Sequence, residues 1–132
     1  MTQKRKDVDN ITLSGLRKHS AELIEEFESA WEIMSNSKDL NELNAWAKLG
    51  LDLANLTSRS WETATQYFFS SSKIADLIPQ SYLVKWSNCG VDICKKSPQL
   101  ATSYFQASPN VITRLRSRHI ETWANFGQRL YK

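Results

Sequence analysis

The chain has 132 residues, of which 41% are hydrophobic and 11% aromatic, with five Trp but only four Gly and three Pro. This composition argues against a β-sandwich or a disordered segment and predicts a single all-α domain that can bury its own core. The net charge of +3 is unevenly divided, because residues 1–66 carry 8 basic against 11 acidic side chains, whereas residues 67–132 carry 9 against 3. The sequence has no run of about 18 apolar residues and no signal-peptide core, so we expect a cytoplasmic protein without a membrane span.

The N-terminal part of the chain is predicted to hold a flexible end and one long helix. Residues 1–10 have no apolar pattern, and we expect them to be flexible. Residues 11–36 carry an apolar stripe at helical spacing, with glutamates mostly on the other side. The stripe consists of Leu16, Leu23, Ile24, Phe27, Trp31 and Met34. We interpret this segment as an N-terminal capping helix that covers the first of several repeats.

Three copies of the pattern W-x-x-x-G follow. Their tryptophans lie 40 and 37 residues apart, and "ATQYF" after the first copy matches "ATSYF" after the second. The repeat anchors are Trp46 with Gly50, Trp86 with Gly90, Trp123 with Gly127, and the pairs Tyr67–Phe68 and Tyr104–Phe105. A period of this length is typical of HEAT- or armadillo-like helical solenoids. The pattern predicts one α-helical repeat domain over residues 11–132, with units at about 40–79 and 80–116 and a partial unit at 117–132.

Each full repeat is predicted to contain a long, a medium and a short helix. Asp39 followed by Glu42 is a capping-box pattern, which indicates the start of the long helix. Ser97–Pro98 and Ser108–Pro109 each place an N-cap residue before a proline at the first helical position. These two pairs predict the starts of the medium and the short helix.

The recurring glycines indicate close packing. Gly inside a helix costs about 1 kcal/mol relative to Ala, yet each glycine lies on the tryptophan-bearing face of its helix. We expect each to open a notch for a neighbouring helix or for the Tyr-Phe pair of the next helix. The alternatives are a glycine kept for ligand access and Tyr-Phe pairs that stack on bases. We favour core packing, because the aromatic residues follow the helical repeat.

A search for reactive or metal-binding groups finds no constellation. The residues considered are His19, His119, Cys89, Cys94, Asp52 and Asp92. The histidines lack ligands at metal spacing, and the cysteines fit small buried hydrophobes better than a disulfide or metal site. The aspartates recur in phase and could bind a basic ligand, but solvated surface positions explain them better. Since phosphate-loop, dinucleotide and nucleophile-elbow motifs are also absent, we expect a non-enzymatic protein with no catalytic residues, cofactor or metal.

The repeat units also carry a family resemblance. "LNAWAKLGLDLA … SWETATQYFFSSSKIADLI" and "LVKWSNCGVDIC … SPQLATSYFQASPNVITRL" resemble a helical region found ahead of the von Willebrand factor A domain in some large bacterial proteins. These belong to the nitric-oxide-reductase-activation and carbon-monoxide-dehydrogenase-accessory group. The resemblance covers residues 40–132 and implies a scaffold in the N-terminal part of a longer protein. Its partners would be a MoxR-type AAA+ ATPase or a metalloenzyme client. The D-x-S-x-S motif of the A domain is absent, so no function of that domain carries over.

The basic second half supports an alternative function, nucleic-acid binding. The candidate partner-binding residues are Lys95, Lys96, Arg114, Arg116 and Arg118. We favour a protein partner, because the other basic residues are scattered. The segment from about 117 to 131 is predicted to be a helix with an uncovered apolar face, through which the chain could self-associate.

Overall fold

The computed structural model describes residues 14–16, 18–36, 38–58, 60–78, 80–114 and 123–124. Within these ranges the chain forms helices and turns and contains no strand, so the predicted all-α class is confirmed. The helices are α2 (Ala21–Met34), α3 (Leu40–Leu56), α4 (Trp61–Ile74), α5 (Gln80–Lys96) and α6 (Pro98–Arg114). The predicted flexible residues 1–10 and nearly all of the predicted last helix lie outside the described residues.

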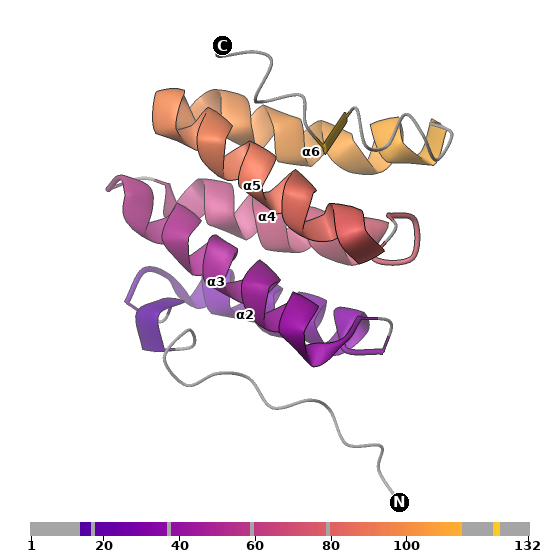
Figure 1. Cartoon of the computed structure of the whole chain (residues 1–132). Coiled ribbons are helices and arrows are strands. Elements are labelled where there is room, and N and C mark those ends of the chain that lie inside the picture. The colour runs from indigo at the N-terminus through magenta and orange to yellow at the C-terminus, as the bar shows by residue number, and fades with distance from the viewer. Residues whose placement is uncertain are drawn as a thin grey trace, which may run out of the picture.

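The five helices are arranged in two layers (Figure 1). α2, α4 and α6 lie side by side in one layer, while α3 and α5 pack together in the other. The layers are joined because α3 also packs against α4, and α5 against α6. α4 and α6 run parallel, since Thr63 Oγ1 lies 2.8 Å from Thr102 Oγ1 and, one turn later, the rings of Tyr67 and Phe105 lie 5.0 Å apart.

Two of the predicted helix starts coincide with observed caps. The Asp39 carboxylate accepts a hydrogen bond from the Glu42 backbone N–H at 2.8 Å, and α3 begins at the next residue. Ser97 Oγ accepts a hydrogen bond from the Leu100 N–H at 3.2 Å, and α6 begins at Pro98. Both side chains satisfy an amide that the first helical turn leaves without a partner.

The predicted continuous helix over residues 11–36 is wrong in its extent. Residues 14–16 form one helical turn, residues 18–19 lie in a turn, and α2 begins only after Ser20. Ser20 Oγ caps α2 by accepting the Glu22 N–H at 3.1 Å. Leu16 is nevertheless buried with the residues of α2. The apolar spacing therefore continues from residues 14–16 into α2, although the turn at residues 18–19 and the cap at Ser20 separate the two helical segments.

The predicted short third helix is also wrong, because Pro109 lies inside α6. A proline at an interior position removes one backbone hydrogen bond and costs about 3 kcal/mol. Beyond it, Ile112 is buried, and burying such a side chain contributes about 1.5–3 kcal/mol. Packing thus offsets the cost, and α6 continues to Arg114. Between α3 and α5 the structure describes one helix, α4, and not two, and α6 runs through Pro109 as one helix.

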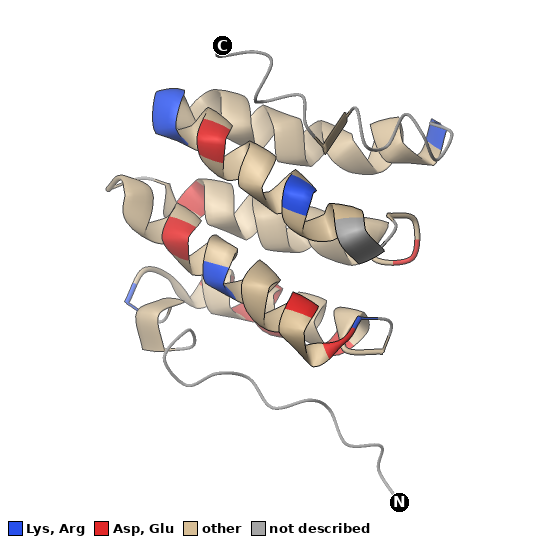
Figure 2. Cartoon of the chain, viewed as in Figure 1, with Lys and Arg blue, Asp and Glu red and all other residues tan. Residues whose placement is uncertain are grey.

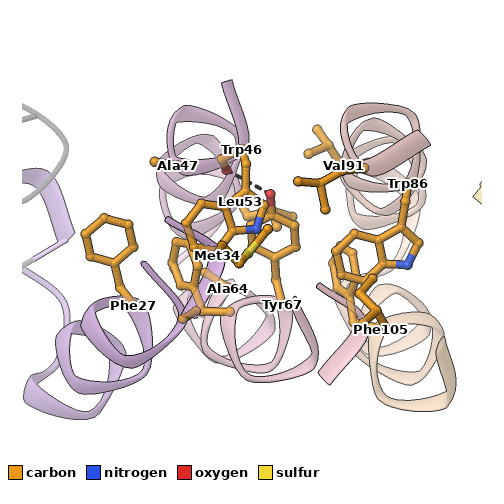
Figure 3. Packing of buried hydrophobic residues seen from close by; sticks show 14 of the residues in the cluster. Phe27, Met34, Trp46, Ala47, Leu53, Ala64, Tyr67, Trp86, Val91 and Phe105 are labelled. Carbon is orange, nitrogen blue, oxygen red and sulfur yellow. Dashed lines mark hydrogen bonds between the residues drawn. The ribbon is translucent and has the colours of Figure 1, made fainter. Parts of the chain in front are cut away.

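Aromatic rings form an unbroken series through the core (Figure 3). The Phe27 ring stacks on Trp46, with centroids 5.9 Å apart, and Tyr67 lies 6.0 Å from Trp46 and 5.5 Å from Trp86. These four rings come from α2, α3, α4 and α5 in turn. The core is therefore continuous along the whole row of helices.

Candidate functional site

The stacked ring pairs share one geometry. Tyr67 stacks on Trp86 with an interplanar angle of 21°, and Tyr104 stacks on Trp123 with an angle of 22°. Phe27 stacks on Trp46 in the same way, again at 21°. In the Phe27–Trp46 pair, Phe27 of α2 takes the position that a tyrosine takes in α4 and α6. This equivalence was missed in the sequence, because α2 carries Phe where α4 and α6 carry Tyr.

The buried indoles of the two repeat tryptophans, Trp46 and Trp86, each donate their N–H to a serine on the next helix. Trp46 Nε1 donates to Ser71 Oγ at 2.8 Å, and Trp86 Nε1 donates to Ser108 Oγ at 2.9 Å. Ser108 Oγ also accepts from Trp123 Nε1 at 3.0 Å. Ser108, predicted as a helix cap, is instead a buried acceptor that holds two indoles.

The two repeat glycines that the structure describes, Gly50 and Gly90, face phenyl rings. A Cβ atom at Gly50 would lie 2.6 Å from Cε1 of Phe68, and one at Gly90 would lie 2.7 Å from Cε2 of Phe105. Carbon atoms do not approach this closely without displacement. The space that a side chain would occupy is therefore filled by the ring, as the notch interpretation requires. Gly127 lies outside the described residues.

The tyrosine hydroxyls bind backbone carbonyls of neighbouring segments. Tyr67 donates to the Trp46 carbonyl oxygen at 2.8 Å, and Tyr104 donates to the Trp123 carbonyl oxygen at 2.7 Å. Burial raises the pKa of Tyr67 well above its usual value, an effect that a hydrogen bond with Ser87 partly offsets. Burial likewise raises the pKa of Tyr104. Both groups are therefore neutral hydrogen-bond donors at physiological pH.

The basic candidate residues do not gather at one place. Lys95 and Lys96 are exposed at the end of α5, and Lys95 lies 3.8 Å from the Asp92 carboxylate. Arg114 is exposed at the far end of α6, which at 1.5 Å per residue lies about 24 Å away. Figure 2 shows these basic positions at opposite ends of α6. Arg116 and Arg118 lie outside the described residues.

The remaining candidates for chemistry lie apart from one another. Cys89 and Cys94 are buried free thiols, and burial raises the pKa of Cys94 while a hydrogen bond with Thr63 lowers it. His19 Nε2 lies 2.9 Å from Asn55 Oδ1, and Asp52 is exposed. Among the described residues, no three His, Cys, Asp or Glu side chains come close enough to hold a metal ion. His119 lies outside the described residues.

The structure adds a surface feature that the sequence did not reveal. An open hollow of about 460 Å³ lies between α2, α4 and α6. The residues that define it are Glu22 and Glu26 of α2, Trp61, Glu62 and Phe69 of α4, and Thr102 of α6. A second hollow of about 470 Å³ adjoins it and shares Glu62 and Thr102. We call the first one the acidic hollow.

No known protein family, curated protein or solved structure matches the chain. Among the described residues, no helix combines the length and the apolar character that crossing a bilayer requires. The functional interpretation therefore depends on the residues and their packing.

Proposed function

We propose that the chain is a non-enzymatic protein-interaction module, built as a helical-repeat solenoid in which α2 is the N-terminal cap. The observation that carries the proposal is the recurrence of one ring pair at the same angle, in Phe27–Trp46, Tyr67–Trp86 and Tyr104–Trp123. Helical pairs stacked in this way bury a continuous core and leave an extended surface for partners.

The composition of α2 supports its role as a cap. A terminal repeat must keep a polar outer face, because no further unit covers it. α2 buries Phe27 and Trp31 against the core, and it carries five glutamates and no basic residue. The role of a cap therefore fits both its buried and its exposed side.

The lining of the surface hollows fits a role in recognition. Histidine is the most frequent general acid or base in catalysis, and cysteine is an intrinsically strong nucleophile. Neither of the two hollows is lined by His or Cys. The polar residues that line them fit recognition of a partner.

The proposed partner follows from the resemblance to the helical region ahead of von Willebrand factor A domains. On this proposal the module acts in the cytoplasm, as the N-terminal part of a longer protein, and binds a MoxR-type AAA+ ATPase or its metalloenzyme client. The basic candidate residues support nucleic-acid binding less well, because those that the structure describes lie at opposite ends of α6.

Sedimentation velocity tests the proposal. The purified chain is mixed at about 50 μM with a MoxR-type ATPase of the same organism, with and without ATP, and separately with the metalloenzyme that this ATPase serves. We expect a complex with at least one of them, with a dissociation constant in the micromolar range or tighter. An unrelated AAA+ ATPase is the matched control. Failure of both mixtures to form a complex, or turnover of a substrate by the chain alone, contradicts the proposal.

A further inference from the structure

The acidic hollow brings together residues that are 80 positions apart in the sequence. Glu22 and Glu26 come from α2, Glu62 from the first turn of α4, and Thr102 from α6. They meet because the three helices lie side by side in one layer. The hollow is therefore a product of the packing and not of any one helix.

The charge of the hollow favours a positively charged ligand. Three carboxylates line it, and none of its lining residues is Lys or Arg. α2 adds further acidic side chains at Glu25 and Glu28. The local potential favours a cation and disfavours phosphate groups or nucleic acid.

The shape of the hollow decides the kind of cation. Among the described residues, no three carboxylates come close enough together to hold a metal ion. The hollow is also large for an ion, at about 460 Å³. The ligand must therefore carry its charge on an extended body that can reach separate carboxylates.

Two aromatic rings complete the site. Trp61 and Phe69 lie on the same face of α4, two turns apart, and Phe69 is 44% exposed. Lys73 Nζ lies 5.0 Å from the centroid of the Phe69 ring, so a ligand cation shares or displaces this ammonium group at Phe69, whereas no such cation contact is described at Trp61. Aromatic rings beside carboxylates suit arginine and lysine, whose apolar stems pack on the rings while the charged ends meet the carboxylates.

We infer that the acidic hollow binds a basic polypeptide segment of a partner protein, with an arginine or lysine side chain between the carboxylates and the rings of Trp61 and Phe69. The inference rests on the proposed function and deepens it, because it assigns the surface and the chemistry of the partner. Charge complementarity and the paired aromatic rings are the observations that carry it.

The test uses the full chain and a fluorescein-labelled peptide of alternating Arg and Gly residues. The same peptide with citrulline at each Arg position controls for charge, since citrulline keeps the shape and removes the charge. We expect the Arg peptide to bind with a dissociation constant below about 1 mM at 50 mM salt, and more weakly at 200 mM salt. We expect the citrulline peptide to bind at least tenfold more weakly. Equal binding of the two peptides, or no binding of the Arg peptide, overturns the inference.

Two double variants locate the binding. Glu22→Gln/Glu26→Gln removes two carboxylates of the hollow, and Glu25→Gln/Glu28→Gln makes the same change of charge on α2 outside it. We expect the first to lower the affinity about five- to tenfold and the second less than twofold, since exposed ion pairs each contribute modestly. Equal losses would show attraction to the whole helix and would overturn the inference.

A spectroscopic measurement separates this inference from the proposed function. In ¹H–¹⁵N spectra, we expect the Trp61 indole N–H signal to shift on addition of the Arg peptide, and the Trp46 signal, which belongs to a buried indole, to remain in place. If the ATPase or its client still forms a complex with the Glu22→Gln/Glu26→Gln variant at unchanged affinity, the proposed protein-interaction function is retained, but the acidic hollow is not the surface that binds the partner. If neither protein forms a complex with the wild-type chain, the proposed function fails, while the peptide titration still decides the chemistry of the hollow.

Discussion

The phenyl ring of Phe68 fills the space in front of Gly50, so that a Cβ atom on the glycine would overlap the ring. The same relationship joins Phe105 to Gly90. Each ring also makes an edge contact with the tryptophan four residues before the glycine, with centroids 5.1 Å apart for Trp46 and Phe68 and 5.0 Å apart for Trp86 and Phe105. The glycine and the tryptophan of one helix thus contact the same phenyl ring of the next helix from two sides.

Gly50→Ala should destabilise the protein. Alanine favours a helix by about 1 kcal/mol over glycine, but overpacking a core costs about 1–3 kcal/mol, and Phe68 is fully buried and has little room to move. We expect a net loss of about 1 kcal/mol in the free energy of unfolding, measured by urea denaturation. In a Phe68→Leu background the same substitution should be neutral or stabilising. A loss of equal size in both backgrounds would exclude the ring as the cause.

Ser108→Ala should cost more stability than Ser71→Ala. Ser71 accepts one indole N–H, whereas Ser108 accepts two. Leaving a buried donor without a partner costs about 1–3 kcal/mol, so we expect about 1–2 kcal/mol for Ser71→Ala and more for Ser108→Ala. Ser72→Ala is the control, since the Ser72 hydroxyl is bonded to the Phe69 carbonyl of its own helix. Urea denaturation measures all three, and a cost for Ser72→Ala as large as for Ser71→Ala would contradict the explanation.

Pro109→Ala should stabilise the protein, and Pro98→Ala should not. Pro109 lies inside α6, where it removes a backbone hydrogen bond, whereas Pro98 is the first residue of the helix, where its missing N–H costs nothing. We expect a gain of about 1–2 kcal/mol at position 109 and a change within about 0.5 kcal/mol at position 98. Thermal unfolding followed by circular dichroism provides the comparison. A loss of stability in Pro109→Ala would show that the proline fits a bend that the packing requires.

The protein should lose stability at alkaline pH through its buried tyrosines. Burial raises the pKa of Tyr67 and Tyr104 in the folded state above the value of about 10 that holds in the unfolded chain. Their contribution is therefore complete below about pH 10 and is lost as the pH rises from there towards the folded-state values, by up to about 1.4 kcal/mol per pH unit for each tyrosine. Urea denaturation between pH 9 and 11 measures the slope. Tyr67→Phe should reduce it, and an unchanged slope in this variant would contradict the prediction.

The chain should bind nucleic acid weakly. Lys95 and Lys96 lie about 24 Å from Arg114 along α6, too far apart for these residues to form one compact phosphate-binding cluster. We expect a dissociation constant weaker than about 10 μM for a 20-base-pair duplex at 150 mM salt, measured by fluorescence anisotropy. Tighter binding that Lys95→Gln/Lys96→Gln weakens would favour the alternative function over the proposed one.

The fold could be predicted from the sequence wherever one local signal decided the outcome. The all-α class followed from apolar spacing, and the starts of α3 and α6 followed from Asp39 and Ser97, whose side chains each accept a hydrogen bond from the amide three residues later. The errors arose where a tertiary contact outweighed such a signal. Ser108–Pro109 has the local form of a helix start, yet buried indoles and the buried Ile112 keep it inside α6.

The candidate site was harder to predict, because its parts come from three helices. Trp61, Thr65 and Phe69 do share one face of α4 in the sequence, and their spacing could have indicated an aromatic surface. Nothing in the sequence relates that face to Glu22 and Glu26, since only the packing of α2 beside α4 brings them together. The equivalence of Phe27 with Tyr67 was hidden because the residue type differs, and only the shared stacking on a tryptophan relates the two rings.

The hydroxyl of Tyr67 and the indole of Trp46 fix the position of α3 along α4. The Tyr67 hydroxyl on α4 donates a hydrogen bond to the Trp46 carbonyl on α3, and the Trp46 indole N–H donates one back to Ser71 on α4. The two helices are therefore joined by hydrogen bonds donated from each side. If α3 slid along α4 by one turn, about 5.4 Å, both bonds would break and the Phe68 ring would leave the notch at Gly50. One-turn shifts of one packed element past another occur in some switching proteins. In this pair the two hydrogen bonds and the ring in the notch all favour one register of α3 on α4.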